Sequence, residues 1–271
     1  MQDYVKPIVP INYFIDAIKL LKLYKVEFIT FDDLIWEGDF DYKNSYPVEF
    51  KNWKNAINNG EFDKNKIYVL IQHDVDSGPR STINICKIEK EMGVRSNIMT
   101  FNRWVVGSEP SNVEKYPIDR LALKNFENEG FLINYHANAL DIAKLDSSKI
   151  YEEFDKDVDE LSKDFNIKYF SPHGGKKTIN GETNNSFNYY DNVKNKIRWV
   201  DNRYSVKFDA KYSDGGLKSR IINNDPKCDI LTFIKKMLPG KRYKMLIHPQ
   251  YYGYKNIVKL NSKLDWYNNL F

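Results

Sequence analysis

The sequence has few of the features that identify a protein by composition alone. Its 271 residues include only two cysteines, Cys86 and Cys228, which excludes a disulfide framework and indicates two reduced thiols. The 41 basic residues nearly balance the 37 acidic ones, and because the excess of +4 is scattered, no nucleic-acid partner is expected. No apolar run reaches the ~20 residues that a membrane-spanning helix needs, and the N-terminus has no signal-peptide pattern. We therefore expect a soluble, cytoplasmic protein without a transmembrane segment.

Short apolar runs rich in β-forming residues alternate with longer helical patterns. The strands are predicted at 66–73, 96–101, 131–136, 168–172, 197–201, 210–214 and 244–248. The helices between them are predicted at 79–92, 117–129, 149–165 and 229–238. This alternation is typical of an α/β fold with a mainly parallel sheet, either open or closed into a barrel.

The first 65 residues follow a different pattern. Residues 11–24 have helical periodicity, a second helix is predicted after Thr30, and a polar, aromatic stretch continues to about Asn65. We interpret residues 1–65 as an N-terminal extension packed on a barrel formed by residues 66–271.

The four histidines of the chain all lie at or just after the end of a predicted strand. They are His73, His136, His173 and His248. A single histidine at such a place is usually a hydrogen-bonded structural residue, but four of them together indicate a site, because α/β proteins build their sites at the carboxyl ends of the strands.

Carboxylates accompany these histidines. Asp74 and Asp76 directly follow His73, and Asp201 and Asp214 lie at two further strand ends. In an Asp-x-Asp pair one carboxylate can bind a cation while the other accepts a proton from water. Capping of the helix that starts at Pro79 is the structural alternative for Asp76.

Five motifs occur in a fixed order and resemble one known family. They are His73-Asp74-Val75-Asp76-Ser77-Gly78-Pro79, Asn134-Tyr135-His136, Ser171-Pro172-His173-Gly174-Gly175, Tyr212-Ser213-Asp214-Gly215-Gly216 and Leu246-Ile247-His248-Pro249-Gln250. Together they resemble the polysaccharide deacetylase family (carbohydrate esterase family four), and within it the divergent His-Asp-Val-Asp branch of surface-polysaccharide biosynthesis proteins. The resemblance covers residues 66–252.

The resemblance implies a distorted (β/α)7 barrel and a role for each matching residue. By this resemblance Asp74 is the catalytic base, Asp76 and His136 are metal ligands, and His248 is the general acid. Asp214 is then the residue that tunes this acid. The Ser171–Gly175 segment forms one wall of the groove, so that Ser171 and Gly174 are expected to contact substrate.

The sequence departs from the family pattern at the second metal-binding histidine. The family places this histidine four residues after the first, where this chain has Leu140. Asn138, His173 or His73 remain as replacements, and our predicted metal set is Asp76, His136 and His173. His73 is instead assigned to substrate binding. Zinc is the first choice of metal, with Mn, Fe, Co and Ni open for a site of carboxylate and imidazole ligands.

The segment Thr30-Phe31-Asp32-Asp33 copies the family's usual first motif but lacks the Gly-Pro that follows it. Thr30 and Asp33 have the spacing of a capping box, so we predict capping there and no catalysis.

The predicted activity is metal-dependent removal of an N-acetyl or similar acyl group from an amino sugar. Trp104 and Tyr251 could stack on a sugar ring, although such residues often pack only against protein. The expected substrate is a small sugar, a nucleotide-sugar or a lipid-linked glycan. A non-catalytic, glycan-binding barrel and another metal-dependent amide or ester hydrolase remain as alternatives.

Overall fold

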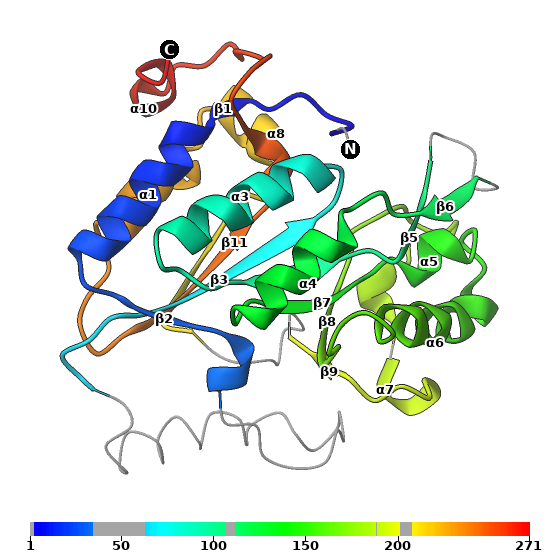
Figure 1. The fold of residues 1–271 in the computed structure, drawn as a ribbon. Helices are drawn as coiled ribbons and strands as arrows, with labels where there is room; N and C mark the ends of the chain where they lie inside the picture. Colours follow the sequence, from blue (N-terminus) through cyan, green and yellow to red (C-terminus); the bar gives the residue numbers. More distant parts are fainter. Residues whose placement is uncertain (1–2, 35–62, 107–111, 188, 201–207) are drawn as a thin grey trace.

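The computed structural model describes residues 3–34, 63–106, 112–187, 189–200 and 208–271 (Figure 1). Asp201, and most of the helix predicted after Thr30, lie outside these ranges. Only a 3-10 turn at Phe31–Asp33 is described there.

The seven predicted strands all form, and they follow one another in chain order around a curled, parallel sheet. They are β3 (Tyr68–Val75), β4 (Asn97–Thr100), β7 (Leu132–Ala137), β8 (Tyr169–Pro172), β9 (Arg198–Trp199), β10 (Ala210–Ser213) and β11 (Arg242–Ile247). The order in space is β10-β11-β3-β4-β7-β8-β9, so the last strand lies beside the first. This is the circular order of a seven-stranded barrel that is open between β9 and β10 in the described part of the chain. The predicted distorted (β/α)7 barrel is therefore confirmed.

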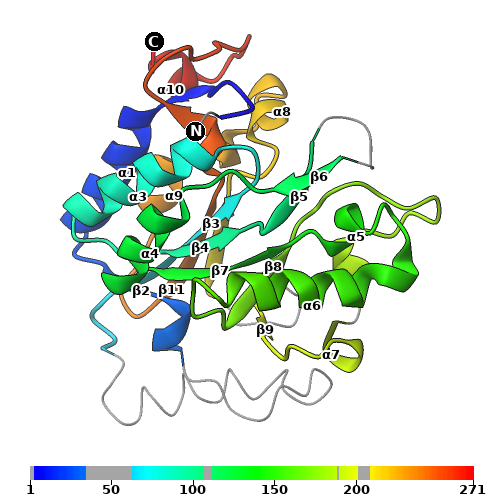
Figure 2. The ribbon, with the colours of Figure 1, turned by 45° about the vertical axis from the view of Figure 1, so that its right-hand side comes forward.

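Helices follow most of the strands and cover the outside of the curled sheet (Figures 1 and 2). They are α1 (Ile11–Leu23), α3 (Pro79–Glu91), α4 (Arg120–Asn128), α5 (Ala139–Ile142), α6 (Ile150–Leu161), α7 (Tyr189–Asn192), α8 (Leu217–Ile222), α9 (Ile230–Ile234) and α10 (Asp265–Asn268). Within the described ranges, no helix is both long and apolar enough to cross a membrane.

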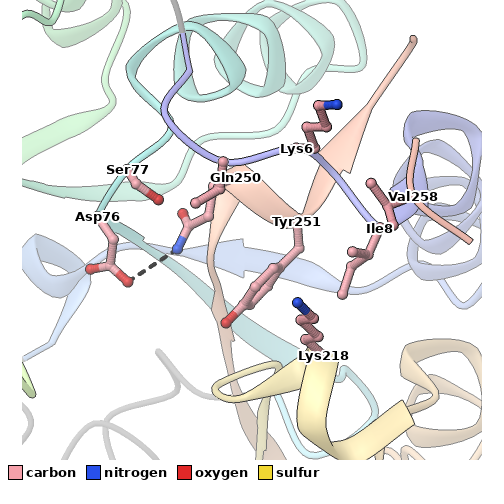
Figure 3. A pocket seen from close by; sticks show the side chains of 9 residues that line it. Lys6, Ile8, Asp76, Ser77, Lys218, Gln250, Tyr251 and Val258 are labelled. Atoms are coloured by element: carbon pink, nitrogen blue, oxygen red, sulfur yellow. Dashed lines mark hydrogen bonds between the residues drawn. The ribbon is translucent and has the colours of Figure 1, made fainter. Parts of the chain in front are cut away.

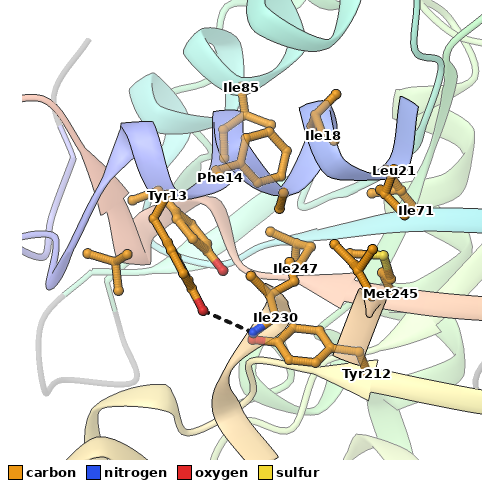
Figure 4. Packing of buried hydrophobic residues seen from close by; sticks show 14 of the residues in the cluster. Tyr13, Phe14, Ile18, Leu21, Ile71, Ile85, Tyr212, Ile230, Met245 and Ile247 are labelled. Carbon is orange, nitrogen blue, oxygen red and sulfur yellow. Dashed lines mark hydrogen bonds between the residues drawn. The ribbon is translucent and has the colours of Figure 1, made fainter. Parts of the chain in front are cut away.

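The N-terminal segment extends the sheet and packs on it. An eighth strand, β2 (Glu27–Ile29), pairs in parallel with the first half of β3, while β4 pairs with the second half. The helix α1 buries Phe14, Ile18 and Leu21 against the side chains of β3 and β11 (Figure 4). The sequence did not predict β2, because three residues that follow a helix give too short a pattern. A domain boundary at residue 65 stays a prediction.

Two short pairings connect distant parts of the chain. The strand β1 (Val9–Pro10) pairs in parallel with β12 (Tyr252–Gly253), and β5 (Arg103–Val105) forms an antiparallel hairpin with β6 (Val113–Lys115). The first pairing holds the N-terminal segment beside the loop that follows β11.

Thr30 and Asp33 form the predicted capping box: the Asp33 carboxylate accepts hydrogen bonds from the Thr30 backbone N–H at 2.7 Å and from its hydroxyl at 2.9 Å. Asp32 accepts a hydrogen bond from the Tyr169 hydroxyl at 2.8 Å. Tyr169 is the first residue of β8, so this motif lies at the amino ends of the strands, opposite the carboxyl ends.

Candidate active site

Three side chains that are distant in the sequence meet at the carboxyl ends of the strands. Asp76 follows β3, His136 lies near the end of β7, and His173 follows β8. The Asp76 Oδ1 atom lies 3.2 Å from His136 Nε2 and 3.5 Å from His173 Nε2. Two ligands of one tetrahedral ion bound at ~2.0–2.1 Å are separated by about 3.3 Å, so the spacing of these donor atoms suits a metal ion.

The hydrogen bond that His136 makes through Nδ1 leaves its Nε2 facing this centre. Its Nδ1 lies 2.9 Å from the carbonyl oxygen of Ser171, which can only accept, so Nδ1 carries the proton. The carboxylate nearest to His173 Nδ1 is that of Asp141, whose Oδ2 lies 3.6 Å away, beyond hydrogen-bond distance. A carbonyl or carboxylate that accepts a hydrogen bond from the second ring nitrogen is the usual support of a metal-binding histidine, and His136 has such a support.

Asp76 has the electrostatics of an ionised ligand. Burial raises the pKa of its carboxyl, but the hydrogen bond with His136 and the charges of His173, His136 and His248 outweigh burial and hold the pKa below its ordinary value. Gln250 Nε2 donates a further hydrogen bond to Asp76 Oδ2 at 3.0 Å (Figure 3). Asp76 therefore carries a negative charge at neutral pH.

Asp76 does not cap α3, which was the structural alternative for it. The N-cap position is Gly78, without a side-chain bond, and the backbone N–H groups of Arg80 and Ser81 donate to Asp3 Oδ1. Gly78 is required for close packing, because a Cβ atom at this position would lie 2.8 Å from Gln250 Cα. Glycine lets the Asp76 loop approach the segment that carries His248 and Gln250.

Asp74 and His248 lie next to the three donors. Asp74 Oδ2 is 4.0 Å from His136 Nε2, and Asp74 Oδ1 accepts a hydrogen bond from Gln72 Nε2 at 2.7 Å. His248 Nε2 is 3.8 Å from Asp76 Oδ2. A carboxylate and an imidazole thus face the same space from two directions.

Asp214 supports His248 from behind. His248 Nδ1 lies 2.6 Å from Asp214 Oδ1, and the Tyr252 hydroxyl donates to Oδ2 of the same carboxylate at 3.1 Å. Burial lowers the pKa of His248, but the charge and hydrogen bond of Asp214, with the charges of Asp76 and Asp74, raise it to about 10. His248 is therefore a protonated donor at neutral pH.

The structure does not bring His73 to this group. Its side chain is fully buried and its Nε2 lies 2.9 Å from Glu89 Oε1 on α3. Neighbouring residues of a strand point to opposite faces, so His73 and Asp74 cannot both face the site. The assignment of His73 to substrate binding is corrected on this ground.

The other predicted contacts lie around the three donors. Trp104 lines a cavity of about 330 Å³ on the His173 side, and Tyr251 lines a second cavity on the other side of Asp76. Gly174 is exposed on its loop, while Ser171 is buried and supports His136 through its carbonyl. Sequence reasoning missed Gln72, Gln250 and Asp141. Gln72 was within reach, since it precedes Asp74 by two residues and therefore shares its face.

Leu140 belongs to the hydrophobic core. It is fully buried in the cluster that also contains Phe101 and Tyr135. We expect Leu140→Ala to lower the free energy of unfolding by about 2–5 kcal/mol, because it leaves a cavity in packed surroundings. Chemical denaturation measures this change. The metal content of the folded variant should match that of the wild type, and a loss of metal would contradict the assignment of the donors.

Comparisons with known proteins give structural neighbours alone. No family model matches the chain, and no curated protein matches it. Among solved structures it is similar to the peptidoglycan deacetylase PdaC from Bacillus subtilis, with 15% identity, a TM-score of 0.40, and coverage of 70% of this chain and 78% of that one.

A Streptococcus mutans CE4 esterase matches with 14% identity and a TM-score of 0.35, over 67% of this chain and 73% of that one. A mutant CE4 family pseudoenzyme with restored activity matches with 14% identity and the same TM-score, over 66% and 56%. The names of these neighbours thus describe a peptidoglycan deacetylase, a CE4 esterase and a CE4 family pseudoenzyme.

Proposed function

We propose that this protein is a metal-dependent hydrolase that removes an N-acetyl or similar acyl group from an amino sugar. The observation that carries the proposal is the convergence of Asp76, His136 and His173, whose donor atoms all lie within 4.8 Å of one another, between Asp74 and His248. The sugar, nucleotide-sugar or lipid-linked glycan expected as substrate, and a role in cytoplasmic steps of surface-polysaccharide biosynthesis, belong to the same proposal.

The three donors fit a divalent transition metal, with zinc as our first choice. Two neutral imidazoles and one carboxylate are a usual catalytic zinc set, which leaves a position open. A cation held there would supply Lewis acidity toward the amide carbonyl and toward water.

The residues beside the donors would handle the protons. Asp74 is placed to accept the proton of the attacking water, and the hydrogen bond from Gln72 fixes its orientation. His248, protonated and held by Asp214, is placed to donate to the leaving nitrogen. Such a donor is needed because an unprotonated amide nitrogen leaves very poorly.

Metal analysis tests the proposal and the replacement of the family's second histidine by His173. We expect about one transition metal per chain in the reconstituted wild type, and loss of that metal in His173→Ala, Asp76→Ala and His136→Ala. His248→Ala is the matched control, because it removes a nearby imidazole that is not a ligand, and it should keep the metal.

Release of acetate from N-acetyl sugars then separates the candidate functions. Metal binding with acetate release supports the hydrolase. Absence of metal in the reconstituted wild type would overturn the proposal in favour of a glycan-binding barrel.

The pH dependence of hydrolysis should depend on Asp214. The protonated form of His248 exists below its pKa of about 10 and is lost as the pH rises through that value. Asp214→Asn removes the largest contribution that raises this pKa, so the alkaline limit of the rate should move to lower pH by about one to three units. A pH–rate profile of both proteins measures the shift. An unchanged alkaline limit would show that a different group sets it.

A further inference from the structure

A cavity of about 470 Å³ opens beside Asp76 (Figure 3), and His173 is not among its lining residues. Its walls come from four parts of the chain: the N-terminal segment, the loop after β3, the segment after β11, and α8. The lining residues are Val5, Lys6, Ile8, Asp76, Ser77, Lys218, Gln250, Tyr251 and Val258.

Two lysines give this cavity a positive charge. Lys6 and Lys218 lie on two different walls; in Figure 3 the Lys218 side chain is directed toward Tyr251 and the Lys6 side chain away from it. Both are exposed, and neither forms an ion pair or side-chain hydrogen bond with any residue that the structure describes. The only acidic residue of the lining is Asp76, whose charge the histidines already face and a metal would offset.

The backbone of the N-terminal segment fixes the position of Lys6. The Ile8 N–H donates to the Tyr251 carbonyl at 3.0 Å, and the Val258 N–H donates to the Pro7 carbonyl at 2.9 Å. Lys6 therefore directly precedes two residues whose backbone is held by hydrogen bonds. Lys218 lies on α8, which follows the loop of Asp214.

The proposed hydrolysis also sets the direction in which a substrate lies. His248 donates to the leaving nitrogen, so the amino sugar lies on the His248 side of Asp76. The His248 and Tyr251 rings are neighbours, with centroids 5.7 Å apart, and Tyr251 lines the cavity. The part of the substrate beyond the amine thus enters the space between the two lysines.

We propose that this cavity binds a phosphate group of the substrate, so that the protein acts on a phosphorylated amino sugar rather than on a neutral polysaccharide. A phosphate with a charge near −2 and three acceptor oxygens can attract the flexible, exposed side chains of both lysines. This inference rests on the proposed hydrolase for the direction of the substrate alone.

Calorimetric binding to the metal-reconstituted Asp74→Asn variant, which should not turn over, tests the inference. The probes are N-acetylglucosamine, N-acetylglucosamine 1-phosphate and UDP-N-acetylglucosamine. We expect both phosphorylated probes to bind at least about tenfold more tightly than the neutral sugar, because hydrogen bonds to charged groups contribute that much. Tighter binding of the UDP-sugar than of the 1-phosphate would identify the substrate as a nucleotide-sugar. Equal binding of the two would identify it as a lipid-linked or free sugar phosphate.

Lysine variants locate the phosphate. Lys218→Met and Lys6→Met keep the apolar stem and remove the charge, and each should lose most of the preference for the phosphorylated probes. Lys176→Met is the matched control, because Lys176 lines the cavity on the His173 side. It should keep the preference.

Two outcomes would overturn the inference. The first is that the phosphorylated probes bind no more tightly than the neutral sugar. The second is that their tighter binding survives in the Lys6→Met and Lys218→Met variants, since the metal would then be what binds the phosphate. Because binding is measured without turnover, a protein that binds the phosphorylated probes yet releases no acetate would refute the hydrolase and leave the phosphate site standing.

Discussion

Asp74→Asn should slow hydrolysis strongly while leaving the metal in place. Asp74 is buried beside the three donors and is not one of them, so its loss removes the proton acceptor without opening the metal site. General base catalysis contributes about 10²–10⁴-fold, and the rate should fall by that factor. Steady-state kinetics and metal analysis of the same preparation measure the two effects.

Asp32→Asn is the matched control for this change. Asp32 belongs to the segment that copies the family's usual first motif, but it bonds to Tyr169 at the amino ends of the strands. The control should keep full activity. If the two variants exchanged these results, the catalytic motif would have to be reassigned to residues 30–33.

His248→Ala should affect amides far more than activated esters. The amide nitrogen needs a proton as it leaves, whereas a nitrophenolate does not. We expect amide hydrolysis to fall by about 10²–10⁴-fold and hydrolysis of 4-nitrophenyl acetate to fall much less. The ratio of the two rates in variant and wild type measures the effect. Equal losses on both substrates would mean that His248 acts in binding or in folding and not as an acid.

The strands of the barrel could be predicted from the sequence because each is a short apolar run between polar segments. That signal is local, and all seven runs formed strands. The pairing of β1 with β12 has no comparable signal, since two-residue strands so far apart in the sequence show no periodicity. The hairpin of β5 and β6 was also missed. Each of its strands has only three residues, and these are partly buried or exposed, so they give no apolar run.

The grouping of the site residues was only partly within reach of sequence reasoning. Strand ends indicated that His136, His173 and His248 would meet, and they do. The alternation of side chains along β3 excludes His73 from the same face as Asp74, and this rule was available in the sequence. The contact of Gln250 with Asp76 was not, because it depends on how closely Gly78 lets two loops approach.

The contacts beside the β1–β12 pairing join segments that leave the ribosome at different times. Pro7 and Ile8 emerge long before their partners Val258 and Tyr251. The barrel strands can pair one after another as they appear, since each lies beside its predecessor, whereas β3 waits for β11. The cavity with the two lysines can therefore form only after β11 has joined the barrel, and binding there becomes possible only then.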